Sequence, residues 1–333
     1  MISEPLQFYI ATLVVLYAIT LIAVLGLNLQ YGVTGVLNFG YAVPIGLGGY
    51  VAALLSLGPP EGTFQTYLFG LGLPFPIPWI AAAIAGAVIS LALGVLVTGR
   101  LRGDYQAIVL LAVSVIATRF IQNQKELVNG GAGLANIPQP MRDLVDSPLG
   151  YQWLYASVAV ILAVATFVVM ERISRGPIGR ALRAVRDNPA AAAAIGKDTV
   201  RLQLLVMAIG GAAAGLAGAM TAQYLTGWNP DAWLMLLTFT YFTGLILGGA
   251  GNSFGVALGI ALIPIGFREA TRFLPTIGYA GLIEALQWVA IGVLALLVLW
   301  LRPNGLVPER PVPYSREGRA SSNLVARVRG GSS

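Results

Sequence analysis

Residues 7–29 read QFYIATLVVLYAITLIAVLGLNL, an apolar run without a charged side chain. A transmembrane α-helix needs about 20 predominantly apolar residues, because the hydrocarbon core of a bilayer is about 30 Å thick. No basic residue precedes this run, and no small-residue cleavage site separates it from a soluble domain. We therefore expect a retained membrane span and not a cleaved signal peptide.

Similar runs recur along the chain, and we expect about nine spans. They cover residues 7–29, 35–57, 78–99, 105–122, 153–171, 203–225, 234–250, 254–270 and 281–301. Because hydrocarbon offers the backbone no hydrogen-bond partner, the spans are predicted to be helices. The expected fold is all-α, a polytopic transmembrane helical bundle, and residues 234–270 are the stretch where a broken or re-entrant helix is expected.

The composition excludes several classes of function. The chain is 57% hydrophobic and 10% charged, with a mean hydropathy of +0.78, whereas soluble domains are about 25% charged. It has no cysteine and no histidine, which removes disulfides, thiol catalysis, most zinc sites and Ser-His-Asp triads. The net charge of +6 is not arranged as a nucleic-acid-binding motif. We expect no metal, no cofactor and no nucleic-acid partner for this chain.

The basic residues gather in two segments, the loop 172–201 and the tail that begins at Arg302. By the positive-inside rule both should face the cytoplasm. An even number of predicted spans separates them, as a shared side requires, and the remaining loops alternate consistently. We therefore expect the N-terminus outside and the C-terminus inside. The predicted organisation is a transmembrane domain over 1–302 and a flexible, basic cytoplasmic tail over 303–333.

The most informative polar segment is SRGPIGRALRAVRDNPAAAAAIGKD, residues 174–198. Arg180, Arg183 and Arg186 recur at helical spacing. Asn188 is a good N-cap, and Gly196 can end a helix in a left-handed conformation. Two short helices are therefore predicted to meet at Asp187–Asn188, the second with an alanine surface. The pattern fits a coupling element that docks on a cytoplasmic motor, but it also fits an amphipathic helix on anionic headgroups.

Small residues and polar residues inside the spans have different predicted roles. Glycines four residues apart let helices approach closely, so packing is the expected role of Gly211/Gly215, Gly244/Gly248 and Gly255/Gly259. Buried polar residues must pair or line a cavity. Two clusters of them supply the candidates for a translocation path, namely Asn38, Tyr41, Gln223 and Tyr224.

Two absences narrow the class of transporter. The sequence contains no G-x-x-x-x-G-K-[ST] motif, so the chain is not expected to hydrolyse ATP. No span carries the row of acidic or lysine side chains that a proton or sodium relay needs. An ion-driven carrier is therefore disfavoured.

Seven blocks, taken in order, resemble one known family. They are GLNLQYGVTGVLNFGYAVPIGLGGYVAALL (26–55), RLRGDYQAIVLLAVSVIATRFIQN (100–123), VNGGAGLANIP (128–138), GRALRAVRDNPAAAAAIG (179–196), LAGAMTAQYLTGWNPDAW (216–233), LGGAGNSFGVALGIAL (247–262) and LRPNGL (301–306). Each string is ordinary by itself, but their order and spacing are specific. The chain resembles the branched-chain amino acid ABC importer permeases, in their LivM-like branch.

The resemblance implies a machine with several subunits. It implies a second, related permease that forms a heterodimer with this chain, two cytoplasmic ATP-binding subunits that use ATP, and an external solute-binding protein. The ATPase would dock on 174–198, through Arg180, Arg183, Arg186, Asp187, Ala190, Ala191, Ala192 and Gly196. Where the family commonly has a glutamate, this chain has Ala190, which implies coupling through shape, with Arg183 and Arg186 free for ion pairs.

The expected function is therefore uptake of branched-chain or other neutral amino acids across a bacterial plasma (inner) membrane, with this chain forming half of the path. One alternative keeps the machine but changes the cargo to urea or short amides. Another is a secondary carrier that works without an ATPase. A membrane enzyme is disfavoured by the lack of histidine and cysteine.

Overall fold

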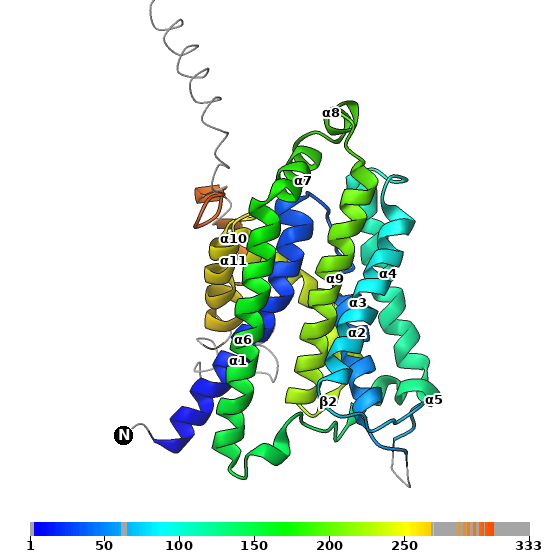
Figure 1. Ribbon diagram of the computed structural model, residues 1–333, viewed down its shortest axis with the longest axis vertical. Coiled ribbons are helices and arrows are strands. Elements are labelled where there is room, and N and C mark those ends of the chain that lie inside the picture. Colours follow the sequence, from blue (N-terminus) through cyan, green and yellow to red (C-terminus); the bar gives the residue numbers. More distant parts are fainter. Residues whose placement is uncertain are drawn as a thin grey trace, which may run out of the picture.

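The structure is a computed structural model that describes residues 3–60 and 65–267, and beyond them positions 269, 286, 289, 290, 292, 293, 296, 297, 300–302 and 304–309. Long helices run roughly parallel to the longest axis of the molecule (Figure 1). Within the described residues, six helices are long and apolar enough to cross a membrane. The chain is therefore a helical, multi-pass membrane protein, as predicted.

The elements follow one another as helices with short connections. The long helices are α1 (Glu4–Asn28, continued by the π-helical turn η1, Leu29–Val33), α3 (Ile77–Val97), α4 (Gly103–Asn123), α6 (Pro148–Arg175) and α9 (Thr199–Tyr224). Shorter helices are α2 (Ala42–Ser56), α5 (Lys125–Val128), α7 (Pro177–Asp187), α8 (Pro189–Ala194), α10 (Met235–Gly248) and α11 (Ser253–Ile260, continued by the π-helical η5, Ala261–Phe267). The small elements are η2 (Gly130–Ala132), β1 (Leu134–Ala135), η3 (Arg142–Leu144), β2 (Gly227–Trp228) and η4 (Pro230–Trp233).

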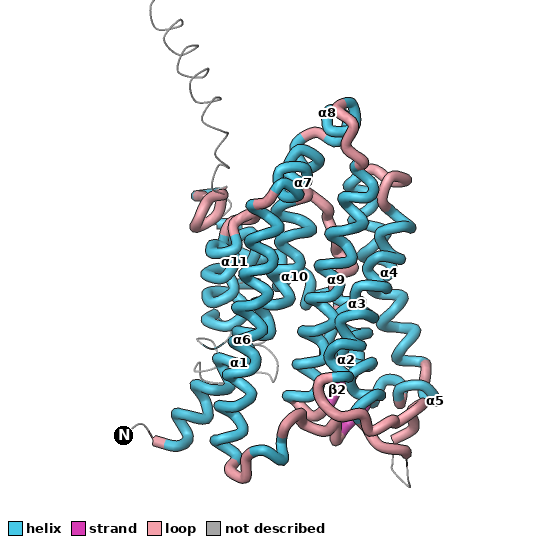
Figure 2. Tube along the Cα trace, viewed as in Figure 1, coloured by secondary structure: helices cyan, strands magenta, loops and turns pink. Residues whose placement is uncertain are grey.

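The two ends of the bundle differ in character. Helices α7 and α8 lie at one end, which we call the basic end because it carries the arginine-rich segment 172–201 (Figure 1). The strands lie at the other, the strand end (Figure 2). There β1 pairs antiparallel with β2, with Leu134 opposite Trp228. This pair joins the loop after α4 to the loop after α9 at the strand end.

Most of the predicted spans match helices within a few residues. The exceptions are the second and eighth: in 35–57 the helix α2 begins only at Ala42, and 254–270 is α11 followed by the π-helical η5. The predicted span 281–301 lies mostly outside the described residues. A total of nine spans, and the orientation in the membrane, therefore stay predictions.

Helices α2 and α10 are too short to cross a bilayer alone, and α10 reaches the length of a candidate span only together with η4 (Pro230–Gly248, 19 residues). They contain 15 and 14 residues, or about 22 and 21 Å at 1.5 Å per residue, against a hydrocarbon thickness of about 30 Å. They begin side by side, where the Ala42 amide donates to Thr238 Oγ1 over 3.0 Å. From there α2 runs toward the strand end and α10 toward the basic end (Figure 1). A broken helix was expected within 234–270, and a second one lies within 35–57.

The centre of the bundle is formed by α1 and α9, and glycine allows the close packing there. In each of these two spans, 61% of the most apolar window is buried. Gly211 and Gly215 of α9 lie directly against Gly86 of α3, and a Cβ on Gly48 of α2 would collide with the Gly215 backbone. Close helix approach through small residues replaces the hydrophobic driving force that is missing in lipid. The packing role predicted for these glycines is confirmed.

We expect Gly215→Val to destabilise the bundle by about 1–3 kcal/mol, because the added side chain meets the backbone of α3, which cannot move aside cheaply. Thermal unfolding in detergent would measure the change. Gly103→Ala is the matched control, since nothing lies within 4 Å of a Cβ at that position, and its midpoint should stay at the wild-type value. Equal midpoints for the two variants would contradict the close-packing interpretation.

Candidate translocation and coupling sites

The non-helical segment between η1 and α2 is held by buried amide side chains. Asn38 Nδ2 donates to Gln30 Oε1 over 2.9 Å, and Asn38 Oδ1 accepts from the Gly40 amide over 3.1 Å. Gln30 Nε2 donates to the Met207 carbonyl of α9 over 3.2 Å. Both Gln30 and Asn38 are fully buried. The break in the second span therefore has a fixed shape that is bonded to the central helix α9.

Tyr41 joins this segment to both central helices. Its ring is fully buried, and its hydroxyl lies 2.7 Å from the Ala23 carbonyl of α1 and 2.9 Å from the Gly210 carbonyl of α9. The hydroxyl shares its single proton between these two carbonyls, since neither has a proton to give. Tyr41 thus fixes the spacing of α1 and α9 at the point where α2 begins.

Gln223 and Tyr224 lie in another part of the bundle, near the strand end. Trp79 Nε1 of α3 donates to Gln223 Oε1 over 2.5 Å. The Tyr224 hydroxyl lies 3.2 Å from Thr12 Oγ1 of α1 and 2.9 Å from Gln152 Oε1 of α6. The four predicted pathway residues therefore form two separate groups, each bonding between helices. Their role in translocation stays a prediction.

Two buried donors without an acceptor lie near the start of α10. Trp233 is 2% exposed and Tyr50 is 3% exposed, and neither Trp233 Nε1 nor the Tyr50 hydroxyl has a hydrogen-bond partner among the described residues. Their rings pack edge to face with centroids 6.4 Å apart, and Trp233 also covers Gly46 of α2. A buried donor left unpaired costs about 1–3 kcal/mol. The pair lies beside the junction of the two half-length helices α2 and α10.

The predicted break at Asp187–Asn188 is confirmed. Helix α7 ends at Asp187, and the Asn188 side chain caps α8 by accepting from the Ala191 amide over 3.0 Å. Gly196 follows in the left-handed region, with φ of +79°. Ala190 and Ala191 are exposed, whereas Ala192 is buried. Helix α8 therefore presents a small, uncharged surface at the tip of the basic end (Figure 1).

The arginines of α7 do not share one environment. Arg183 and Arg186 both pair with Glu309: Arg183 Nε contacts Oε1, and Arg186 Nη1 lies 2.9 Å from Oε2. Arg186 Nη1 also donates to the Gly32 carbonyl over 2.5 Å. Arg180 is exposed. Arg183 and Arg186 were expected to be free for ion pairs with a partner, but in this structure they bind the chain's own C-terminal segment.

Residues 304–309 were expected to belong to a flexible tail, yet they pack on the end of α10. The Leu306 amide donates to the Leu247 carbonyl over 2.8 Å, and the Val307 amide donates to the Gly248 carbonyl over 3.0 Å. Asn252 Nδ2 donates to the Pro308 carbonyl over 3.0 Å. Residues 310–333, the rest of the predicted tail, lie outside the described residues.

Comparison with known sequences identifies the family. The family described as "Branched-chain amino acid transport system / permease component" matches residues 9–301. The chain belongs to this family.

Individual relatives place the permease near one branch. It is 30% identical to the probable branched-chain amino acid transport permease protein LivM of Methanocaldococcus jannaschii, over 91% of this chain and 94% of the relative. It is 31% identical to the high-affinity branched-chain amino acid transport system permease protein LivM of Escherichia coli (strain K12), over 93% of this chain and 72% of the relative. The probable LivH permease of M. jannaschii is 26% identical over 85% of this chain and 86% of the relative. No solved structure matches.

The resemblance seen in the sequence is thus confirmed, and the sequence missed two features of the permease. Trp233 was visible only as part of a family-like block, and Tyr50 lies in a glycine-rich run without other polar groups. No pattern marks them as unpaired donors, because that property depends on what surrounds them. Glu309 was visible as a tail residue, but its contact with α7 spans more than a hundred residues.

We expect Glu309→Gln to lower the stability of the permease by about 1–2 kcal/mol, because both guanidinium groups lose a charged acceptor. It should also free residues 304–309 from α10. The chain has no cysteine, so Val307→Cys can be labelled with a maleimide without background, and the label should react faster when Glu309→Gln is also present. Arg201→Gln is the control: its pair with Asp198 is highly exposed, and its loss should change little. Equal labelling rates with and without Glu309→Gln would contradict the proposed contact.

Proposed function

We propose that this permease carries neutral amino acids into the cell, as one of two related permease subunits driven by two ATP-binding subunits and supplied by an external solute-binding protein. The main observation that supports this proposal is the match of residues 9–301 to a branched-chain amino acid permease family. M. jannaschii has one relative named LivM and another named LivH, which supports a pair of distinct permeases. A prokaryotic plasma membrane is the location that these relatives support, and ATP would be used by the partner subunits and not by this chain.

The charge distribution supports an orientation for this machine. Arg172, Arg175, Arg180 and Lys197 are exposed or partly exposed at the basic end. Lysine and arginine are retained on the cytoplasmic side of membrane proteins. The basic end would then face the cytoplasm, where an ATPase is available, and the strand end would face the solute-binding protein.

Helix α8 is the proposed contact with the ATPase. Its alanines leave no long side chain between the helix backbone and a partner, so a groove can receive it closely. Because Arg183 and Arg186 are held by Glu309, the docking surface that remains is Ala190, Ala191 and the 71% exposed Ile195. This supports coupling through shape, as the alanine at position 190 suggested.

We expect Ala191→Trp to abolish docking, because the indole fills the space that a closely packed groove would need. Substrate-stimulated ATP hydrolysis by the reconstituted complex should fall at least about tenfold, equivalent to about 1.4 kcal/mol of lost interaction. Ile116→Trp, on the exposed side of α4 between the two ends (Ile116 is 66% exposed), is the control and should leave ATP hydrolysis and membrane insertion unchanged. Full stimulation in the Ala191→Trp complex would remove α8 from the coupling site.

The junction of α2 and α10 is the proposed place for substrate inside the membrane. Transporters commonly bind substrate where broken helices meet, because half-helix ends and freed backbone groups are available there. The α10 N-terminus has no side-chain cap, and Trp233, with its unpaired Nε1, lies just before it. Together with the Tyr50 hydroxyl these donors suit the carboxylate of an amino acid, and the exposed Asp231 of η4 suits its ammonium group.

We expect Tyr50→Phe and Trp233→Phe to raise KM for amino-acid uptake by about fivefold or more each, since each removes a donor to the carboxylate, worth about 1 kcal/mol or more. Thermal stability should stay equal or rise in Tyr50→Phe, because only an unpaired buried hydroxyl is removed. Trp233→Phe also removes packed ring volume, so its unfolding midpoint should fall. Uptake into vesicles and unfolding midpoints would be measured in parallel. Variants with normal KM would show that these donors do not meet the substrate.

Two rivals make different predictions. If the cargo is urea or a short amide, the cognate solute-binding protein will be stabilised by those solutes and not by leucine or valine. If the chain is a secondary carrier, it will transport in vesicles without any ATPase subunit, whereas the proposed permease will be inert alone.

A further inference from the structure

A surface groove lies along the last turns of α6, at the basic end. It has a volume of about 400 Å³ and is lined by Phe167, Val168, Glu171, Arg172, Arg175 and Gly176. These residues repeat at intervals of four along the helix, in two neighbouring rows, 167, 171, 175 and 168, 172, 176. Phe167 and Val168 give the groove an apolar inner part, and the charged residues lie toward the helix end.

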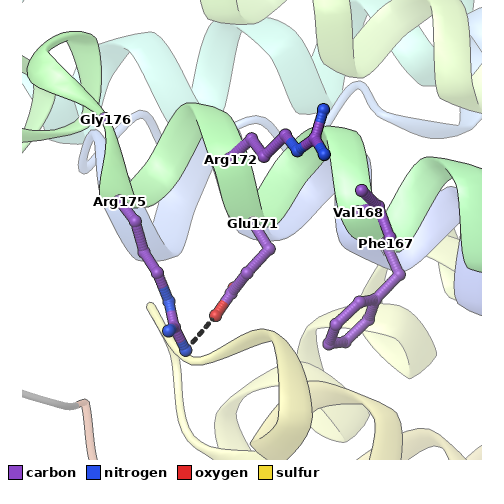
Figure 3. Close-up of a pocket in the computed structure, with 6 residues that line it drawn as sticks. All are labelled: Phe167, Val168, Glu171, Arg172, Arg175 and Gly176. Atoms are coloured by element: carbon purple, nitrogen blue, oxygen red, sulfur yellow. Dashed lines mark ion pairs between the residues drawn. The ribbon is translucent and has the colours of Figure 1, made fainter.

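The charged side chains that line the groove do not all pair with one another. Glu171 is paired with Arg175 over 2.5 Å and also accepts from Ser253 Oγ of α11 over 2.7 Å. Arg172 is exposed, and no carboxylate among the described residues lies within ion-pair distance of it. Figure 3 shows that Arg172 leaves α6 on a different side from Arg175 and extends back along the helix toward Val168. The groove therefore carries one uncompensated positive charge directly above its apolar part.

A strip of exposed apolar side chains continues from the groove along α6 toward the N-terminus of the helix. Val168 is 41% exposed, Val164 is 56% exposed and Ile161 is 65% exposed, at a spacing of three to four residues. On the other side, Phe167 packs edge to face on Phe254 of α11 with centroids 4.8 Å apart, which gives the groove a fixed wall. An apolar surface of this length with a guanidinium at its end is complementary to a phospholipid, which has an acyl chain below a phosphate headgroup.

We propose that this groove binds an anionic phospholipid, with the phosphodiester on Arg172 and one acyl chain along Val168 and Val164. Arginine is suited to phosphate because its planar fork donates two parallel hydrogen bonds. A lipid is favoured over a soluble phosphate because the charged and apolar parts are continuous on a helix that spans the membrane. The inference concerns lipid binding and does not depend on the direction or substrate of transport.

The experiment uses the full-length chain in nanodiscs of phosphatidylcholine with phosphatidylglycerol added in steps. Native mass spectrometry after release counts the lipids retained. Wild type is expected to retain one phosphatidylglycerol in preference to phosphatidylcholine. Arg172→Gln should weaken that retention about fivefold, the equivalent of about 1 kcal/mol per basic residue at a membrane surface.

Two further variants make the test specific. Val168→Trp keeps every charge but fills the apolar part, and it should weaken retention as Arg172→Gln does. Arg180→Gln removes the same charge from exposed α7, outside the groove, and should retain lipid as wild type does. Equal loss in Arg180→Gln and Arg172→Gln would show diffuse attraction and overturn the site. Equal retention of the two lipids by wild type would also overturn it.

Discussion

The break between Val33 and Ala42 is the constraint on which the rest of this permease depends. Irregular backbone is tolerated at membrane depth only where protein surrounds it, because each unpaired polar group there costs several kcal/mol. Gln30 and Asn38 supply bonds inside the break, Thr34 Oγ1 donates back to the Leu29 carbonyl over 2.9 Å, and Thr238 accepts from the first amide of α2. Since these partners come from α9 and α10 as well, the break can form only when the central helices have already assembled.

The same arrangement occurs twice, in opposite directions. In the first half, Gln30-Tyr31 at the end of α1 and η1 is followed by Thr34-Gly35, by Asn38 and by the half-length helix α2. In the second half, Gln223-Tyr224 at the end of α9 is followed by Thr226-Gly227, by Asn229 and by the half-length helix α10. Each glutamine is buried and bonds to a neighbouring helix. Each asparagine accepts from a backbone amide close behind it, Gly40 or Ala232. Inverted repeats with broken helices are a common design in transporters, and here the two broken helices meet at Ala42 and Thr238. The bond between Ala42 and Thr238 therefore joins the two half-length helices directly.

Much of the fold could be predicted from local pattern, and the remainder depended on contacts distant in the chain. Apolar runs marked most of the helices, since length and hydropathy are local properties. Asn188 marked the break between α7 and α8, because an N-cap acts within three residues. The start of α2 was missed because residues 35–41 are as apolar as a helix. Gly35 is in the left-handed region, with φ of +78°, and Asn38 and Tyr41 bond to Gln30, α1 and α9 instead of within a helix. Glu309 was missed as the partner of Arg183 and Arg186 because it is distant from them in the sequence. The unpaired Trp233 Nε1 was missed because the lack of an acceptor depends on the side chains that surround it in the fold.

The ion pairs at the basic end connect the proposed docking surface with the break. Arg186 lies between Glu309 and the Gly32 carbonyl, and a Cβ on Gly35 would meet the Arg186 side chain, so α7 rests on the turn where the second span departs from helical geometry. Glu309 in turn lies against Gly251, whose amide donates to Asn28 Oδ1 over 2.9 Å, in the connection between α10 and α11. A displacement of α8 by a partner would therefore reach α7 first, and through Arg186 and Glu309 it would reach both broken helices together. In the proposed complex, the exposed alanines of α8 would receive the partner by shape. The ion pairs of Arg183 and Arg186 with Glu309 would then transmit its movement toward the broken helices.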